Sequence, residues 1–374
     1  MTHSLDNHDL SADLLDDDTL HLARSKVVAA LEALGRCETL PHLRDDVLAL
    51  RSALANGAAT LRPDGPGDDT VALGGAYLRG ELAQIAESLT VERARYYISR
   101  LLRAVDADPR CAAVNDINLN RWKEYDDIVT DSLWQIDRRD ASGVHRADYW
   151  GNFVPQIPYQ MLRRYTRPDE WVIDPFSGLG TTLIEAQRLG RNAIGIDLRP
   201  DIVERSTQLL NQERNAFGTQ RCLEVGDATC YDFRGALERH GRSSAQLAIL
   251  HPPYFDIIKF SDNPRDLSNA ASIDDFLAMM GKVIDNVSRV LDAGRYLVLV
   301  IGDKYARGDW VPLGFHTMNE VLKRGYSLKS IIVKNFEGTA GKRSQKELWR
   351  YRALAGGFYV FKHEYIFVMR KHKR

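Results

Sequence analysis

The spacing of apolar residues changes along this chain, from a helical period in its first third to alternating strands and helices after residue 170. From Thr19 onward, apolar side chains recur at i, i+3 and i+4 and predict a helix that ends near Gly35. A second helix is predicted over 41–54, a linker rich in Gly, Pro and Asp follows over 55–69, and helices resume over 70–105 with a break at Thr90. We therefore predict an α-helical domain over 19–110, preceded by an acidic tail, 1–18, that is disordered.

The stretch from 171 to 200 predicts a strand, a glycine turn, a helix and a second strand. An apolar run from Trp171 ends on Asp174, Gly178 and Gly180 permit a tight turn, and the next apolar run ends on Asp197. Such a unit is half of a nucleotide-type α/β fold, which binds its ligand at the carboxyl ends of the strands. Further strands are predicted at 221–227, 246–250, 295–301, 327–333 and 365–369, the last two as an antiparallel pair at one edge, with helices at 157–165, 200–217, 273–290 and 315–324.

The glycine turn lacks the features of two common phosphate-binding loops. Threonines follow Gly180 where a dinucleotide fingerprint requires G-x-G-x-x-G, and the Gly-Lys-Ser/Thr of a P-loop is missing. Asp197 is placed to accept hydrogen bonds from ribose hydroxyls and Asp174 lies near the loop, which suits a ligand with an amino-acid part and a ribose. S-adenosylmethionine is such a ligand, and an ordinary strand–loop–helix turn is the alternative on the glycines alone.

Three motifs in a fixed order carry a more specific signal. Asp174-Pro-Phe-Ser-Gly-Leu-Gly-Thr-Thr, then Gly195-Ile-Asp-Leu, then a strand that ends in Pro252-Pro-Tyr together resemble the S-adenosylmethionine-dependent amino-methyltransferases of DNA. These enzymes methylate N6 of adenine or N4 of cytosine. The resemblance runs from about residue 120 to the C-terminus. It implies a Rossmann-like, mostly parallel seven-stranded sheet with helices on both faces, in a catalytic domain over 161–374.

The resemblance also implies which residues bind the cofactor. An aromatic-rich segment, 111–160, covers it through Phe153, and Asp227 accepts a hydrogen bond from its adenine amine. The full predicted set is Phe153, Asp174, Pro175, Phe176, Gly178, Gly180, Thr181, Asp197, Leu198 and Asp227.

The catalytic segment is predicted to be His251, Pro252, Pro253 and Tyr254. An exocyclic amine is a poor nucleophile because its lone pair is delocalised into the ring, so the enzyme must orient it and accept hydrogen bonds from its protons. Prolines stiffen the loop and lack an N–H, which suits the Pro252 carbonyl as acceptor. Tyr254 is expected to stack on a base flipped out of the duplex. Methyl transfer is then a direct displacement that needs positioning, without a covalent enzyme intermediate or a metal.

His251 departs from the family, which usually has Asp, Asn or Ser at this position. It is interpreted as an acceptor that replaces those residues, as a structural histidine beside the proline carbonyl, or as the mark of a changed substrate. An accepting imidazole must be unprotonated, so activity is expected to fall as the pH drops toward about 6.5. The adenine-or-cytosine choice stays open.

Two loops combine basic residues with positions near the expected base site. The loop 255–269 offers Lys259 and Arg265 to phosphates. The loop 338–357 interleaves Lys and Arg with Trp349 and Tyr351, which favours a nucleic-acid contact over a solvated charged excursion. Its predicted DNA-binding residues are Lys342, Arg343, Lys346 and Arg350. Arginines of the N-terminal helices indicate target recognition or partner contact by that domain, or simply a solvated surface.

Net charge, cysteine spacing and the lengths of apolar runs exclude several classes of protein. The 374 residues carry a net charge of −1, which argues against a non-specific polycation, and the four cysteines lack zinc-site spacing. The sequence offers neither a signal peptide nor a membrane-length apolar run, so we expect a cytoplasmic protein. The prediction is a site-specific methyltransferase of double-stranded DNA that uses S-adenosylmethionine and serves restriction–modification, with a possible restriction or defence partner. An RNA base-amine methyltransferase and a catalytically decayed S-adenosylmethionine-binding protein are the alternatives.

Overall fold

The computed structural model describes residues 18–306, 308–335 and 346–373, with Lys346 and Glu347 described only as backbone. Residues 1–17 of the predicted acidic tail lie outside this range. The chain divides into two compact units, one formed by 1–113 with 117–127 and the other by 114–116 with 128–374. Each unit has its own hydrophobic core. No helix among the described residues has the length and apolar character that a membrane span requires.

The first unit is helical with a small added sheet. Its helices are α1 (Arg24–Gly35), α2 (Leu40–Ala55), α3 (Gly75–Ala86) and α4 (Val91–Asp106), with 3-10 turns η1 (Ala59–Leu61) and η2 (Leu119–Glu124). β1 (Thr19–Ala23) pairs antiparallel with β2 (Thr70–Gly74). The predicted helices at 19–23 and 70–74 are therefore wrong, because pairing between segments about 50 residues apart overrides the local pattern. The predicted break at Thr90 is a helix N-cap, whose hydroxyl accepts from Arg93 N at 3.1 Å.

Arginines of α4 bind within the first unit. Arg95 donates to the carbonyl oxygens of Gly35 and Cys37 at 3.1 Å each, and Arg100 pairs with the buried Glu81. Arg95 thus satisfies carbonyl groups at the C-terminal end of α1, and Arg100 balances the charge of the Glu81 carboxylate. These contacts therefore favour a packing role for these two arginines over contact with an external ligand.

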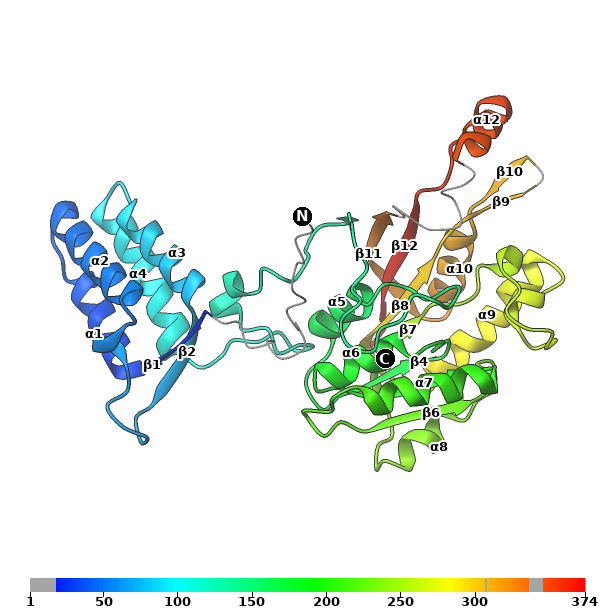
Figure 1. The fold of residues 1–374 in the computed structure, drawn as a ribbon, viewed down its shortest axis with the longest axis horizontal. Helices are drawn as coiled ribbons and strands as arrows, with labels where there is room; N and C mark the ends of the chain where they lie inside the picture. Colours follow the sequence, from blue (N-terminus) through cyan, green and yellow to red (C-terminus); the bar gives the residue numbers. More distant parts are fainter. Residues whose placement is uncertain (1–17, 307, 336–345, 374) are drawn as a thin grey trace, which may run out of the picture. The chain divides into compact units, whose positions relative to one another are not determined.

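The second unit is an α/β fold around an eight-stranded sheet in the order β3-β11-β12-β8-β7-β4-β5-β6 (Figure 1). β12 runs antiparallel to both its neighbours, β8 and β11, and the other neighbouring pairs are parallel. The sheet is thus mostly parallel, as predicted, with one strand more than expected. Its strands are β3 (Leu133–Trp134), β4 (Trp171–Asp174), β5 (Asn192–Asp197), β6 (Arg221–Val225), β7 (Ala245–Leu250), β8 (Leu291–Ile301), β11 (Tyr326–Asn335) and β12 (His363–Lys371).

The predicted antiparallel pair near the C-terminus is present as β11 and β12, but not at an edge. β12 pairs with β8 along Tyr365–Arg370, and the two-residue β3 pairs with β11 on the outer side. β8 and β11 thus occupy both hydrogen-bonding sides of β12. Both of its faces are covered as well, since Ile366, Phe367, Val368 and Met369 are all 0% exposed.

Helices cover both faces of the sheet. One face packs on α5 (Gln156–Tyr165), α6 (Thr181–Arg188) and α7 (Pro200–Gln212), and the other on α8 (Phe233–Glu238), α9 (Ile273–Ser288) and α10 (Leu313–Leu322). Adjacent β4 residues show the alternation, since Val172 belongs to the first core and Ile173 to the second. The remaining elements are the hairpin β9 (Lys304–Ala306) and β10 (Asp309–Val311), the 3-10 turns η3 (Phe255–Ile257) and η4 (Leu267–Asn269), and α12 (Lys346–Gly356).

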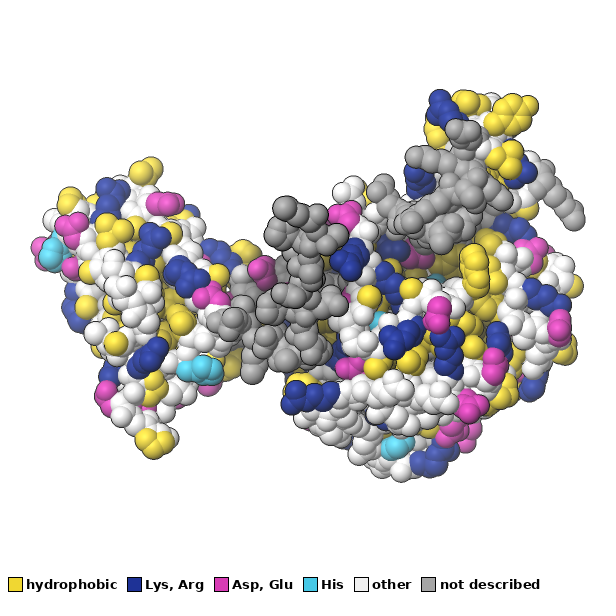
Figure 2. Space-filling model, in the orientation of Figure 1, with side chains coloured by type: hydrophobic (Ala, Val, Ile, Leu, Met, Phe, Trp, Pro, Cys, Tyr) yellow, Lys and Arg dark blue, Asp and Glu magenta, His cyan; other side chains and the backbone are white. Residues whose placement is uncertain are grey.

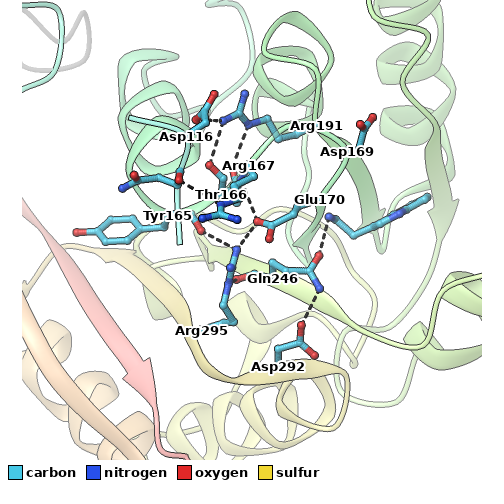
Figure 3. Close-up of polar contacts among 12 residues, drawn as sticks. Asp116, Tyr165, Thr166, Arg167, Asp169, Glu170, Arg191, Gln246, Asp292 and Arg295 are labelled. Atoms are coloured by element: carbon cyan, nitrogen blue, oxygen red, sulfur yellow. Dashed lines mark hydrogen bonds and ion pairs between the residues drawn. The ribbon is translucent and has the colours of Figure 1, made fainter. Parts of the chain in front are cut away.

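A polar network ties the amino ends of the central strands together (Figure 3). The buried Arg191 guanidinium donates to Asp116 Oδ1 at 2.8 Å and to the Thr166 carbonyl at 3.0 Å. Arg295 of β8 pairs with Glu170, and Gln246 of β7 accepts from Trp171 N at 2.9 Å. These groups are occupied with one another, which leaves the opposite, carboxyl ends of the strands for a ligand.

Candidate active site

A cavity of about 380 Å³ opens at the carboxyl ends of β4, β5, β6 and β7. Four loops meet there, one after each strand, and the covering segment before β4 adds aromatic side chains. All of the lining residues belong to the second unit. The loops contribute Pro175, Phe176, Ser177 and Gly178; Asp197, Leu198 and Arg199; Gly226, Asp227 and Ala228; and His251, Pro252, Pro253 and Tyr254.

The glycine turn needs its glycines for conformation and for space. Gly178 has φ +50° and Gly180 has φ +78°, values that side chains rarely adopt. A Cβ on Gly180 would lie 2.4 Å from Ser206 Oγ of α7, and one on Gly178 would lie 3.3 Å from the Tyr149 ring. The turn therefore brings α6 close to α7 and lets the aromatic cover approach the loop.

Asp174 lies beneath the loop rather than on the cavity surface. It is 1% exposed, and its Oδ1 accepts from Phe176 N at 3.0 Å. Its Oδ2 and the Ser177 hydroxyl oxygen are buried without a hydrogen-bond partner among the described residues. Burial, with a smaller effect of the Asp197 charge, raises the pKa of Asp174 to about 6. Of these two groups, Ser177 lines the cavity and Asp174 does not.

Asp197 and Asp227 present carboxylates to the cavity. Asp197 accepts from Gly178 N at 3.1 Å and from Arg199 N at 3.0 Å, so backbone amides fix its orientation. Burial raises the pKa of Asp197 above its ordinary value. Asp227 accepts from the backbone and hydroxyl of Thr229 at 2.9 and 2.7 Å. Each carboxylate keeps lone-pair capacity for a ligand hydroxyl or amine.

Apolar walls complete the cofactor side. Phe153 is 7% exposed, and its ring centroid lies 4.8 Å from that of His251. Phe176 and Leu198 line the same cavity. Two carboxylates, a serine hydroxyl at the glycine loop, and aromatic and aliphatic walls fit S-adenosylmethionine in size and polarity.

Of the predicted cofactor residues, Asp174, Gly180 and Thr181 do not line the cavity, whereas the other seven do. Thr181 donates its hydroxyl to Asn152 Oδ1 at 2.7 Å, so it holds the covering segment. Whether any of the ten contacts the cofactor stays a prediction.

The segment after β7 brings its four predicted residues to the other side of the cavity. The Tyr254 hydroxyl donates to Glu364 Oε2 at 2.7 Å and lies 3.2 Å from His251 Nε2. Lys334 Nζ donates to Glu364 Oε1 at 2.9 Å. Lys334 of β11 and Glu364 of β12 face each other in register and also line the cavity. Sequence reasoning missed both, because polar residues on distant strands carry no local signal.

Burial also decides the protonation of this segment. It lowers the pKa of His251 to about 4, so the imidazole is neutral well below pH 6.5. The structure therefore contradicts the premise that the His251 imidazole gains a proton near pH 6.5. Burial, together with the Glu364 charge, raises the pKa of Tyr254 well above its ordinary value, so its hydroxyl keeps its proton.

The predicted DNA contacts are dispersed. Arg265 lines the cavity, whereas the exposed Lys259 is paired with Asp262 at 2.6 Å. Lys342 and Arg343 lie outside the described residues, and the side chain of Lys346, the first residue of α12, is not described. Arg350 of α12 is exposed. A role in DNA binding stays a prediction for each.

Two segments of the chain, 105–208 and 245–374, match a family model described as DNA methylase, of the N6/N4 type. The chain belongs to this DNA methylase family. The matched segments include the glycine loop after β4, the strand end at Asp197 and the Pro-Pro-Tyr segment after β7, which all line the cavity. S-adenosylmethionine is the cofactor of this methyltransferase family.

Individual relatives match over short segments. The type II methyltransferase M.MjaII of Methanocaldococcus jannaschii is 39% identical over 75 residues, 20% of this chain and 14% of that protein. The type II methyltransferase M2.DpnII of Streptococcus pneumoniae is 32% identical over 100 residues, 25% of this chain and 34% of that protein. The match therefore spans about a third or less of the length of these relatives. Among solved structures, TrmN from Thermus thermophilus matches with a TM-score of 0.38 and 15% identity, over 59% of this chain and 49% of that one.

Proposed function

We propose that this protein methylates an exocyclic amine of a base in double-stranded DNA, N4 of cytosine or N6 of adenine, at a specific sequence. One observation carries the proposal: the Pro-Pro-Tyr segment after β7 and the carboxylates of Asp197 and Asp227 line one cavity. A base amine held by the first would lie beside a cofactor held by the second. Such proximity supplies much of the rate enhancement in a displacement that needs no covalent enzyme intermediate.

The residues that would hold S-adenosylmethionine follow from their chemistry. The Asp197 carboxylate suits ribose hydroxyls, and the Asp227 carboxylate suits an adenine amine. Phe153, Phe176 and Leu198 supply apolar contacts, and the unpaired Ser177 hydroxyl oxygen suits an amino group. When bound, S-adenosylmethionine supplies an electrophilic methyl group on a positively charged sulfur.

The residues after β7 act on the target amine. The Pro252 carbonyl accepts a hydrogen bond from the amine and turns its lone pair toward the cofactor side of the cavity. Pro252 and Pro253 offer no N–H that could compete for the lone pair. The Tyr254 ring provides a face on which a flipped base stacks, a contact worth about 1–3 kcal/mol.

DNA outside the flipped base would be held by local contacts rather than by overall charge. Lys and Arg side chains are interspersed with Asp and Glu on the face of the molecule that Figure 2 shows, in keeping with a net charge of −1. Arg265 at the cavity and Arg350 on α12 are the described cations best suited to phosphates. A restriction or defence partner and a cytoplasmic location, both predicted from the sequence, stay predictions.

Single-molecule sequencing of genomic DNA from cells with and without this gene tests the proposal. We expect one modified motif that depends on the gene and disappears in cells that carry Asp197→Ala, which removes the carboxylate assigned to the cofactor. The kinetic signature of the modified base separates cytosine from adenine. Genomic DNA without a modified motif, from cells whose purified protein binds S-adenosylmethionine, would overturn it. Methylation of RNA by that protein, or binding without turnover, would then identify the true function.

A further inference from the structure

Four side chains of the candidate active site form one hydrogen-bonded chain across three elements. Lys334 on β11 donates to Glu364 on β12 at 2.9 Å, Glu364 accepts from the Tyr254 hydroxyl at 2.7 Å, and that hydroxyl lies 3.2 Å from His251 Nε2. Lys334 and Glu364 are 5% and 3% exposed. A buried ion pair contributes little net stability, so its position beside the catalytic segment indicates another use.

The direction of each hydrogen bond follows from the groups involved. The Lys334 ammonium can only donate, and the Glu364 carboxylate can only accept. Tyr254 has a single hydroxyl hydrogen, and it donates that hydrogen in its hydrogen bond to Glu364. The Tyr254 oxygen therefore presents only lone pairs to His251 Nε2, so that nitrogen must be the donor.

This arrangement decides the tautomer of His251. A neutral imidazole carries one hydrogen, and burial keeps His251 neutral because it lowers the pKa to about 4. With the hydrogen on Nε2, Nδ1 holds a lone pair. His251 lines the cavity, and none of the described residues is hydrogen-bonded to Nδ1.

We propose that Lys334 and Glu364 are positioning residues that act through Tyr254 to hold His251 as the Nε2-protonated tautomer, so that Nδ1 accepts a hydrogen bond from the target amine. The inference rests on the proposed function and deepens it. Asp, Asn and Ser, the usual residues at this position, can each accept through oxygen. Histidine accepts only through its unprotonated nitrogen, so a neighbouring group must hold the hydrogen on the other nitrogen.

The test reads the tautomer directly in the full chain. Nitrogen-15 labelling of histidine and a two-bond proton–nitrogen spectrum show which ring nitrogen carries the hydrogen, and the signal lost in His251→Asn identifies His251. We expect Nε2–H in the unaltered protein. Nδ1–H would overturn the proposal.

Glu364→Gln is the decisive variant because Lys334 fixes how the new amide lies. The amide oxygen accepts from Lys334, so the NH₂ group faces the Tyr254 oxygen and donates to it. The Tyr254 hydroxyl hydrogen then turns to His251 Nε2, which becomes an acceptor, and the histidine hydrogen moves to Nδ1. We expect this inverted tautomer and a kcat for DNA methylation lower by about 5- to 150-fold, the range for one buried group left unsatisfied.

Two controls keep the result specific. Glu238→Gln, the same change at an exposed residue of α8, should leave the tautomer and kcat unchanged. KM for S-adenosylmethionine should stay within about 2-fold in Glu364→Gln, because Glu364 contacts Lys334 and Tyr254 and none of the residues predicted to hold the cofactor. If Glu364→Gln does not fold, Tyr254→Phe keeps the stacking ring but removes the hydroxyl, and should give a mixture of tautomers with a lower kcat.

The outcomes separate this inference from the proposed function. An unchanged tautomer in Glu364→Gln, an inverted tautomer with unchanged kcat, or Tyr254→Phe with a single Nε2–H signal and full kcat would overturn the inference alone. An unaltered protein with Nε2–H that methylates no DNA would overturn the proposed function and leave the tautomer selection supported.

Discussion

The surroundings of His251 change the pH at which its imidazole gains a proton. An exposed histidine gains a proton near pH 6.5, but burial lowers the pKa of His251 to about 4. We expect kcat for methylation to stay level as the pH falls from about 8 to about 6, since the imidazole remains an acceptor throughout. The measurement is a pH–rate profile of the unaltered protein and of His251→Asn. An acid limb near pH 6.5 that His251→Asn removes would contradict the expectation.

The buried carboxylate of Asp174 destabilises the folded state at neutral pH. Burial, and secondarily the Asp197 charge, raises its pKa from 3.8 to about 6, so the folded state holds the ionised carboxylate less readily than the unfolded state does. The free energy of unfolding is therefore highest below the unfolded pKa of 3.8, where Asp174 is protonated in both states, and it falls as the pH rises through about 6. At pH 7.5, Asp174→Asn should therefore raise the free energy of unfolding by about 1–3 kcal/mol, because asparagine still accepts from Phe176 N.

Denaturant unfolding without cofactor checks the Asp174 prediction. The difference between Asp174→Asn and the unaltered protein should shrink as the pH falls below about 6. Asp309→Asn, at an exposed residue of β10, should change stability little at any of these pH values. A destabilised Asp174→Asn protein at pH 7.5 would show that the carboxylate is stabilising in spite of its burial.

At the scale of elements, the polar network at the amino ends of the strands fixes how β4 and β5 meet the segment before them. Arg191 is 3% exposed and contacts Asp116 and Thr166, whereas Arg205 pairs with Asp148 at the surface. Arg191→Met should lower the free energy of unfolding by about 2–4 kcal/mol, because it leaves buried acceptors unsatisfied. Arg205→Met should lower it by less than about 1 kcal/mol.

Equilibrium unfolding of the two variants measures this contrast. Equal losses in Arg191→Met and Arg205→Met would mean that the network is no more than a set of surface pairs. Because the network lies at the far ends of the strands, S-adenosylmethionine affinity should not change in the folded Arg191→Met variant.

At the scale of the whole molecule, the chain has two units with separate cores. The fragment 114–374 retains the cavity and its lining residues, so we expect it to fold and to bind S-adenosylmethionine with unchanged affinity. If the first unit assists target recognition, the fragment should methylate DNA with relaxed sequence preference. Sequencing of methylated genomic DNA measures this, and an unchanged motif would assign the first unit another role.

DNA binding is the second property of the whole molecule that can be tested. Replacing Lys342, Arg343 and Arg350 by Ala should weaken DNA binding and reduce the slope of log K against log salt by about 2–3, close to one per lost phosphate contact. Replacing Arg214, Arg242 and Lys282, three exposed cations elsewhere, removes the same charge and serves as the control. An equal loss in both triple variants would indicate attraction by overall charge instead of contacts made by Lys342, Arg343 and Arg350.

The sequence alone determined the features that depend on neighbours along the chain. Gly178 and Gly180 indicated the turn after β4 because only glycine adopts its backbone angles, and Pro252-Pro-Tyr indicated the stiff loop after β7. Alternating strands and helices indicated the α/β fold of the second unit. These signals are local, since backbone conformation and burial period are written in adjacent residues.

Tertiary structure alone decided what depends on pairing and burial. β1 and β2 are strands because they pair with each other across about 50 residues, and β12 lies inside the sheet because β8 and β11 flank it. Lys334 and Glu364 reach Tyr254 and His251 only through the register of β11 and β12. The pKa values of His251 and Asp174 likewise follow from burial, which depends on the packing of segments distant in the sequence and is absent from any short stretch of it.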